Sequence, residues 1–494
     1  MIIDPVLLII IPLLAAFLVP MVSLFSKKIA GIIPLLGLIG MAVVMAVDFS
    51  ELYNGPITST TGGFDPPWGI SILLTPLGGL LAAGMIGIGL FVLISEIGGE
   101  RSRHQTTYDT MVMMATAGAV GMVITGDLFN MFVFLEITSI AGVVLAAIPR
   151  EGDDKGLNWR GAAVYAVIGG VASFIVLAGI ALLYGSTSTL NIAQIAERIG
   201  DVDTFVIGVS FLALFIGLGI ESELFPLNGW VPEVYRGSRW GTGSLFSGVI
   251  GKAGLLALLR ISMVVLSPGL ENEIIPNILL WVGAATYIFG EAAAFTSKDL
   301  YRMLGYSSIG VFGLLTASFA LGVDGGVRGG SLILIGHLLA KPLLFSMLGF
   351  AGRRKKGDVP LSSLRGLIRS SPAAGIMMTI GALALIGMPP SPTFWGKFFL
   401  FSAAGSEAEW LLIALLLLGT ILEAGYLGRI LFYIFDQSNP TRSDRLPIAR
   451  GIMGAVAVLL ILLIGILPGS LEDLFDLVVS ELLDPSTYTS WGVF

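Results

Sequence analysis

Long apolar runs separated by short polar stretches dominate this chain. Runs of about 17 to 25 apolar residues are long enough to cross a bilayer as helices. Reading them in order predicts about fourteen membrane-spanning helices, with end points good to about 2 to 4 residues. Their approximate limits are 5–26, 29–47, 71–95, 108–125, 128–148, 161–184, 204–234, 241–266, 277–296, 300–322, 328–350, 372–405, 408–435 and 447–468.

Composition supports the same class of protein. The 494 residues are 55% hydrophobic and 12% charged, with a mean hydropathy of +0.91. These values are typical of an all-α, polytopic membrane protein in contact with the lipid bilayer. The longest predicted loop, between Val47 and Ile70, is too short for a separate soluble domain. Any chemistry must therefore take place within the membrane or in a partner.

The distribution of Lys and Arg predicts the orientation, because these residues accumulate in short cytoplasmic loops. Loops after even-numbered spans hold only Arg198 and Arg328. These loops and both termini are therefore placed on the outer face of the cytoplasmic membrane. The loops after odd-numbered spans are assigned Lys27, Lys28, Arg101, Arg103, Arg150, Lys155, Arg160, Arg236, Arg239, Lys298, Arg302, Arg353, Arg354, Lys355, Lys356, Arg365, Arg369, Arg442, Arg445 and Arg450.

Several kinds of chemistry are disfavoured by what the chain lacks. It has no Cys and only two His, which excludes thiolate-held clusters and makes paired haem ligation improbable. It has no Walker A motif and no dinucleotide fingerprint in a strand-to-helix setting. We therefore expect no cofactor, no nucleic-acid partner and no enzymatic activity of the chain by itself.

Charged residues lie inside the predicted spans, where each costs at least about 2.5 to 3.5 kcal/mol on insertion scales. So many charges of both signs indicate an ion pathway rather than a purely structural membrane scaffold. The cations are Lys252, Arg260, Lys341, Lys397 and Arg429, and the other titratable residues are Glu136, Glu221, Glu223, Glu291, Glu423 and His337.

Proline interrupts the seventh and twelfth predicted spans. Pro226 and Pro232 lie in the seventh, and Pro389, Pro390 and Pro392 lie in the twelfth. Because proline removes a backbone donor and clashes with the preceding turn, both helices should break there. Breaks at membrane depth are tolerated where they line a cavity or are buried in protein, although ordinary kinks are an alternative.

The two breaks are five spans apart, which predicts two five-helix repeats of inverted topology. The first repeat would cover residues 108–266 (spans 4–8) and the second residues 277–435 (spans 9–13). A three-helix segment at 1–107 would precede them. The last span and an amphipathic tail at 447–494 would follow, with the stretch 471–483 lying at the outer interface or binding a partner.

Six segments carry a resemblance to a known family. They are GDLFNMFVFLEITSIAG from Gly126, FPLNGWVPE from Phe225, GKAGLLALLR from Gly251, KDLYRMLGYSSIG from Lys298, HLLAKPLLF from His337 and PPSPTFWGKF from Pro389. The chain resembles the antiporter-like subunits of respiratory complex I. The motif sequences are most similar to those of the D-type subunit of Mrp cation/proton antiporters and of its counterparts in membrane-bound hydrogenase and sulfane sulfur reductase. The match covers nearly the whole chain in the same order.

This resemblance implies proton translocation along the membrane midplane, by a subunit of a complex with other membrane subunits. The family's fifth-helix glutamate falls on Glu136 and its eighth-helix lysine on Lys252. Its eleventh-helix residues fall on His337 and Lys341, and its twelfth-helix residue falls on Lys397. Before the motif is considered, an alternative is that Lys397 is a lysine near the helix break that snorkels to the interface.

One position departs from the family. A lysine usually pairs there with the fifth-helix glutamate, but this chain has Glu221. Three alternatives follow: Lys252 replaces the missing partner of Glu136, the carboxylates share a proton, or they bind a hard cation such as Na⁺. Glu221 at this position also supports an alternative function, in which the chain is a transport-inactive scaffold subunit of such a complex. A self-sufficient permease for an organic solute is a third class.

The remaining buried charges have structural interpretations as well. Arg260 and Arg429 could pair with Glu291 or Glu423, and either acid could instead feed a half-channel or face another subunit. Tyr306, Ser307 and Ser308 are plausible partners for water in a hydrated channel, although serine in membrane helices more often serves packing.

Overall fold

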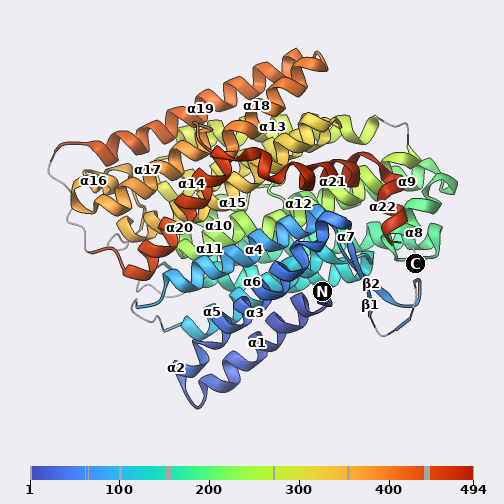
Figure 1. Cartoon of the computed structure of the whole chain (residues 1–494), viewed down its shortest axis with the longest axis horizontal. Helices are drawn as coiled ribbons and strands as arrows, with labels where there is room; N and C mark the ends of the chain where they lie inside the picture. The colour runs from blue at the N-terminus through green and yellow to red at the C-terminus, as the bar shows by residue number, and fades with distance from the viewer. Residues whose placement is uncertain are drawn as a thin grey trace.

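The computed structural model describes residues 3–61, 63–64, 66–98, 103–150, 158–270, 273–352, 357–438 and 445–492. Long helices pack side by side, from the N-terminal helices at one edge to α18 and α19 at the other (Figure 1). The C-terminal helices return across the middle of the molecule (Figure 1). Of the predicted loop cations, Arg101, Lys155, Arg353, Arg354, Lys355, Lys356 and Arg442 lie outside the described residues.

The described residues of the N-terminal part and the first half of the chain form twelve α-helices. They are α1 (Leu7–Ser23), α2 (Lys27–Ala30), α3 (Ile33–Phe49), α4 (Pro76–Ser95), α5 (Gln105–Ile124), α6 (Leu128–Ala147), α7 (Trp159–Thr187), α8 (Ile192–Arg198), α9 (Thr204–Glu221), α10 (Val231–Gly237), α11 (Trp240–Leu245) and α12 (Gly251–Leu259).

The second half and the C-terminal part continue in the same way. They hold α13 (Ile274–Thr296), α14 (Leu300–Ala320), α15 (Asp324–Gly352), α16 (Leu367–Ser370), α17 (Pro372–Ile386), α18 (Pro392–Ser406), α19 (Trp410–Phe435), α20 (Ile448–Ile466), α21 (Glu472–Leu483) and α22 (Pro485–Gly492). Within the described residues, 12 helical segments are long and apolar enough to cross a membrane, and α1 and α17 are shorter apolar helices. The chain is thus a polytopic membrane protein, while the count of fourteen spans stays a prediction.

Both proline-rich stretches interrupt the helices. Helix α9 ends at Glu221, and Glu223 adopts a left-handed φ of 58° before the chain resumes a helix at α10. Helix α17 ends before Gly387, also left-handed, and α18 begins at Pro392 with Ser391 capping it. Proline fits the first turn of a helix, where its missing N–H has no intrahelical partner. The broken ends therefore follow from the positions of the prolines.

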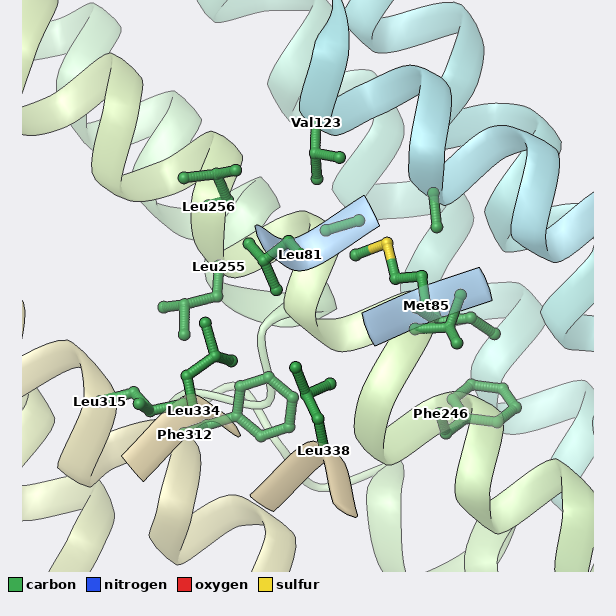
Figure 2. Packing of buried hydrophobic residues seen from close by; sticks show 14 of the residues in the cluster. Leu81, Met85, Val123, Phe246, Leu255, Leu256, Phe312, Leu315, Leu334 and Leu338 are labelled. Carbon is green, nitrogen blue, oxygen red and sulfur yellow. The ribbon is translucent and has the colours of Figure 1, made fainter. Parts of the chain in front are cut away.

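Two π-helical segments flank α12, namely Phe246–Ile250 and Arg260–Leu266. Together with α11 and α12 they make one helical stretch, Trp240–Gly269, which is buried as far as Ser267. Apolar side chains of α4, α12, α14 and α15 meet around it, including Leu81, Leu255 and Leu334 (Figure 2). This packing places the α12 side chains at the centre of the molecule.

The all-helical expectation missed a small sheet. Strands β1 (Ile57–Thr61) and β2 (Ile70–Leu74) pair antiparallel, with Ile57 opposite Leu74. Four consecutive residues of β2 are buried, so its inner end continues the apolar pattern of the adjoining span. A buried strand with apolar residues on both faces cannot be told from a helix by periodicity.

Several predicted loop cations lie inside helices instead: Lys27 and Lys28 in α2, Arg160 in α7, Arg236 in α10, Arg302 in α14, Arg369 in α16 and Arg450 in α20. Arg239 does lie between α10 and α11, but it is buried, and its guanidinium lies 4.5 Å from the ring centre of Tyr108. A helix can be longer than the apolar run that marks it. Cations in its polar end turns are then assigned to loops when hydropathy is the only guide.

The predicted amphipathic tail forms α21, but its apolar face is covered by the chain itself. Leu474, Phe475, Val478 and Leu482 are buried, and α21 packs on α4 and α15. That face is therefore not left for lipid or a partner.

Candidate functional site

The titratable residues singled out by the sequence are buried with few exceptions. The buried side chains among them are Glu221, Glu223, Lys252, Arg260, Glu291, His337, Lys341, Lys397 and Glu423. Glu136 and Arg429 are partly exposed. Buried charges need compensation, so the partners of each group decide what it can do.

Glu136 and Glu221 are held by hydroxyl donors. The Glu136 carboxylate on α6 accepts a hydrogen bond from Ser173 on α7. Glu221, the last residue of α9, accepts bonds from Ser139 Oγ at 3.0 Å and from Tyr165 OH at 2.8 Å. Helices α6 and α7 therefore supply neutral hydroxyl donors to both carboxylates.

Glu223 lies in the break between α9 and α10. Its Oε1 accepts a hydrogen bond from Tyr235 OH at 2.9 Å, and Tyr235 belongs to α10. The side-chain amide of Asn228 donates to the Glu223 carbonyl at 3.2 Å and so closes the turn. The break therefore determines the direction of the buried Glu223 carboxyl, which would be different in a continuous helix.

Lys252 has no hydrogen-bond partner for its Nζ among the described residues. The ammonium lies 3.6 Å from the centre of the Phe312 ring, close enough for a cation–π contact. A small cavity of about 10 Å³ adjoins it, lined mostly by leucine, and has about the minimum room for one water. The suggestion that Lys252 pairs with Glu136 is therefore wrong.

His337 and Lys341 lie one turn apart on α15. Lys341 Nζ donates to the Leu304 carbonyl at 2.9 Å. Neither ring nitrogen of His337 has a hydrogen-bond partner in the described part of the chain. An unsatisfied buried polar group costs about 1 to 3 kcal/mol, so the fold keeps this histidine at the expense of stability.

Lys397 and Glu423 form a buried ion pair, with 2.5 Å between Nζ and Oε2. The lysine also donates to the Ile386 carbonyl at 3.1 Å, where α17 ends. Lys397 therefore does not snorkel to an interface. Glu291, on neighbouring α13, has no hydrogen-bond partner for either carboxylate oxygen among the described residues.

The proposed partners of the two arginines are wrong. Arg260 Nη2 lies 3.4 Å from Glu481 Oε1, and the guanidinium also donates to the Val123 carbonyl and to Thr75 Oγ1. Arg429 donates to the Phe295 carbonyl and lies over the Phe295 ring. Glu481 was overlooked because it lies in the tail, which only the folded chain brings back over the π-helical segment.

Hydroxyl residues were the main omission of the sequence-based prediction. Ser139, Tyr165, Ser173, Tyr235 and Tyr426 each donate a hydrogen bond to a carboxyl group of the site or to another hydroxyl. Serine and tyrosine in apolar helices commonly serve packing, so their partners are visible only in three dimensions. A weak signal existed in Tyr165 and Tyr235, because a buried tyrosine hydroxyl usually requires a partner.

The described residues contain no group of three or more His, Asp or Glu side chains arranged to hold a metal ion. Glu136 and Glu221 supply two carboxylates, which is one acid short of such a group. Neutral hydroxyl oxygens would have to complete any cation site there.

Comparison with known proteins places this arrangement in a family. The family model described as NADH:quinone oxidoreductase/Mrp antiporter, TM matches residues 125–423. NADH-quinone oxidoreductase subunit N of Desulforudis audaxviator is 31% identical over 433 residues, which cover 86% of this chain and 85% of that protein. The D-type subunit of the Na(+)/H(+) antiporter of Alkalihalophilus pseudofirmus is 28% identical over 496 residues, covering 97% of this chain and 98% of that one.

A solved structure extends the likeness to three dimensions. A chain of the membrane-bound sulfane sulfur reductase, an archaeal respiratory membrane complex, matches with a TM-score of 0.91. The two chains are 29% identical, and the match covers 99% of each. The resemblance inferred from the six sequence motifs is thereby confirmed. The chain belongs to the NADH:quinone oxidoreductase/Mrp antiporter transmembrane family.

Proposed function

We propose that this chain translocates protons as an antiporter-like subunit of a multisubunit, energy-converting membrane complex. The observation that carries the proposal is the burial of Lys252, Glu291 and His337 without a hydrogen-bond partner, among the described residues, for their titratable atoms. A fold selected only for stability would replace such groups with apolar side chains. Ionisable residues inside membrane segments more often mark ion pathways and proton relays.

The route would run along the membrane midplane from Glu136 through Lys252, His337 and Lys341 to Lys397. Hydrated half-channels from the two faces would feed it. Glu221 and Glu223 would serve the first half, while Glu291 and Glu423 would serve the second. Opening and closing the Lys397–Glu423 pair would change the charge at one end of the route and so bias the neighbouring groups.

The arrangement of helices supports the two inverted repeats, 108–266 and 277–435. In the first, α5 packs on α6 and α7 packs on α9; in the second, α13 packs on α14 and α15 packs on α17. The corresponding broken helices are α9–α10 and α17–α18. Segments 1–107 and 447–494 would flank the repeats. The odd number of helices in each repeat would give the two repeats inverted topology, and the Lys and Arg distribution favours both termini outside.

Other membrane subunits would supply the energy for transport. The relatives are named as subunits of NADH-quinone oxidoreductase and of a Na(+)/H(+) antiporter, and the similar structure is a sulfane sulfur reductase complex. We assign this chain no catalysis and no cofactor of its own. Redox or ion-gradient energy would reach it through displaced charge or altered hydration at subunit contacts.

Exchange of protons for Na⁺ is a second candidate, favoured by the environment of Glu136 and Glu221. The two carboxylates and the hydroxyls of Ser139, Tyr165 and Ser173 form a set of oxygen atoms between α6, α7 and α9. Hard cations prefer oxygen ligands of this kind. The same set could instead hold a proton, so the transported ion must be measured.

The test compares Glu136→Gln and Glu221→Gln in vesicles that contain the intact complex under its driving reaction. Proton movement is followed with a pH-sensitive dye, with and without Na⁺ and a protonophore. Glu407→Gln, at an exposed position, is the matched control. Loss of transport in both test variants supports the proposal. Loss only in Glu136→Gln means that the route bypasses Glu221, and full transport in both means that the chain is a scaffold.

A further inference from the structure

Two buried tyrosines approach the same region of α14 from opposite halves of the chain. Tyr235 lies on α10 in the first half, and Tyr426 lies on α19 in the second. We propose that Tyr235 and Tyr426, with Ser308 and Ser307 of α14, are hydroxyl links that carry protons between the buried carboxyls and Lys341. This inference rests on the proposed function and names residues of the route that no charge pattern marks.

The first link begins at the broken helix. Tyr235 OH donates to Glu223 Oε1 at 2.9 Å, and the hydroxyls of Ser247 and Ser308 also interact with this tyrosine. Ser308 Oγ lies 3.2 Å from Ser247 Oγ. Tyr235 is fully buried and stacks on Phe345, so its ring has little freedom to turn away. A fixed ring with a rotating hydroxyl suits a proton relay.

The Leu304 carbonyl brings this link to Lys341. It accepts a hydrogen bond from Lys341 Nζ at 2.9 Å and another from Ser308 Oγ at 3.0 Å. The ammonium and the serine hydroxyl therefore lie within two hydrogen-bond lengths of one another. A rotation of the Ser308 side chain, or one intervening water, is enough to connect them.

The second link reaches α14 from the second half of the chain. Tyr426 OH donates to Ser307 Oγ at 2.6 Å, and the Glu291 carboxyl, which makes no hydrogen bond among the described residues, interacts electrostatically with this tyrosine. Ser307 and Ser308 are consecutive residues, so their side chains point about 100° apart around the helix. Lys341 interacts electrostatically with Glu291 of the second half of the chain and with Glu223 of the first. The lysine is thus the natural meeting point of the two links.

The proton step is balanced at each tyrosine. Tyr235 passes its phenolic proton to the Glu223 carboxylate while its oxygen takes a proton from Ser308 or Ser247. The tyrosine stays neutral, and the serine regains a proton from Lys341 in its ammonium form. At the other link, Tyr426 takes a proton from the Glu291 carboxylic acid and gives its own phenolic proton to Ser307. Ser307 in turn passes its hydroxyl proton, through an intervening water, to Lys341 in its neutral amine form. Rotation of the hydroxyl groups then restores the starting arrangement.

The experiment uses Tyr235→Phe and Tyr426→Phe in the intact complex, assayed as proton transport in vesicles. Each change removes one oxygen atom and leaves the buried ring in place. We expect transport to fall by about tenfold or more in both variants, because a positioned proton-transfer group contributes at least that much. The solvent deuterium isotope effect should change as well, which a purely structural role would not cause.

Tyr488→Phe is the matched control, since Tyr488 is equally buried and its hydroxyl has no hydrogen-bond partner among the described residues. Transport by the two test variants equal to that of Tyr488→Phe overturns the inference. If Glu136→Gln abolishes transport in the same preparation, the proposed function survives and only the links fail. If Glu136→Gln is also active, the proposed function fails too.

A second pair of variants covers the case in which the phenylalanine variants do not assemble. Ser308→Ala removes the hydroxyl at the junction, whereas Ser331→Ala removes an equally buried hydroxyl that donates to the Val327 carbonyl of its own helix. Reduced transport in Ser308→Ala alone supports the first link. Equal transport in both contradicts it.

Discussion

Lys397 and Glu423 join the second half of a broken helix to its neighbour through a buried ion pair of 2.5 Å. Lys397 belongs to α18, and Glu423 belongs to α19. Both side chains are almost fully buried, so water screens the pair poorly. The pair therefore stabilises this corner of the molecule only while both charges are present, and a proton that neutralises Glu423 would release Lys397.

Removal of one partner should be costly and removal of both much less so. We expect Glu423→Gln to lower the stability of the chain by about 3 to 5 kcal/mol, because it leaves an uncompensated buried ammonium. The double change Lys397→Met with Glu423→Leu should recover most of this loss. Thermal unfolding of the purified complex measures both. Equal losses in the single and double variants would argue against a strong pair.

The buried contact between Arg260 and Glu481 should hold the tail in place. We expect Arg260→Gln to leave Glu481 buried without its cation and to loosen α21, at a cost of about 3 to 5 kcal/mol. Arg429→Gln is the comparison, because Arg429 contacts Phe295 near the surface and should change stability by no more than about 0.5 kcal/mol. Limited proteolysis of residues 472–483 reports the loosening. Similar cleavage of both variants would contradict the role of Arg260.

The attachment of the tail should also depend on pH. Burial raises the pKa of Glu481 above its ordinary value of 4.5, although Arg260 and the Leu77 N–H oppose the shift. The folded state therefore binds the proton more tightly than the unfolded state, so the stability of the tail falls as pH rises from 4.5 through the raised pKa. Cleavage of α21 should increase over that range, and Glu481→Gln should abolish the dependence. If cleavage of α21 instead increases as the pH is lowered, the tail is less stable when Glu481 is protonated, and the prediction is wrong.

Gly310 makes room for the Glu291 carboxyl. A β-carbon at this position would collide with Glu291 Oε1. We expect Gly310→Ala to displace the carboxyl and to destabilise the chain by about 1 to 3 kcal/mol, as overpacking usually does. Gly428→Ala is the control, because a β-carbon there would meet no described atom within 4 Å apart from its chain neighbours and the backbone of its own helix turn. Melting temperatures of the two variants test this. Equal values would mean that Glu291 can move aside freely.

Much of the fold was predictable from the sequence, because hydropathy marks long spans and proline marks the breaks. The apolar runs located the membrane helices, and Pro226 and Pro392 indicated where α9 and α17 stop. The hairpin of β1 and β2 was not predictable, because its apolar residues continue the adjoining span. The π-helical turns beside α12 leave no pattern in composition either.

Only part of the candidate site was predictable from the sequence, namely its charged residues. Charged residues such as Lys341 and Glu223 stand out in apolar runs, so their positions could be read directly. Their partners could not, because Tyr235, Ser173 and Glu481 come from distant segments and are ordinary residues in their own surroundings. Pairings between segments far apart along the chain, as between Arg260 and Glu481, arise only when the helices pack.

The most direct test of the central claim is proton transport by the intact complex carrying Lys341→Met. Lys298→Met, at an exposed position, serves as the control. If protons pass through the buried residues of this chain, the Lys341 variant assembles but moves protons only at the background rate, while the control transports normally. Normal transport by an assembled Lys341→Met complex would contradict the account.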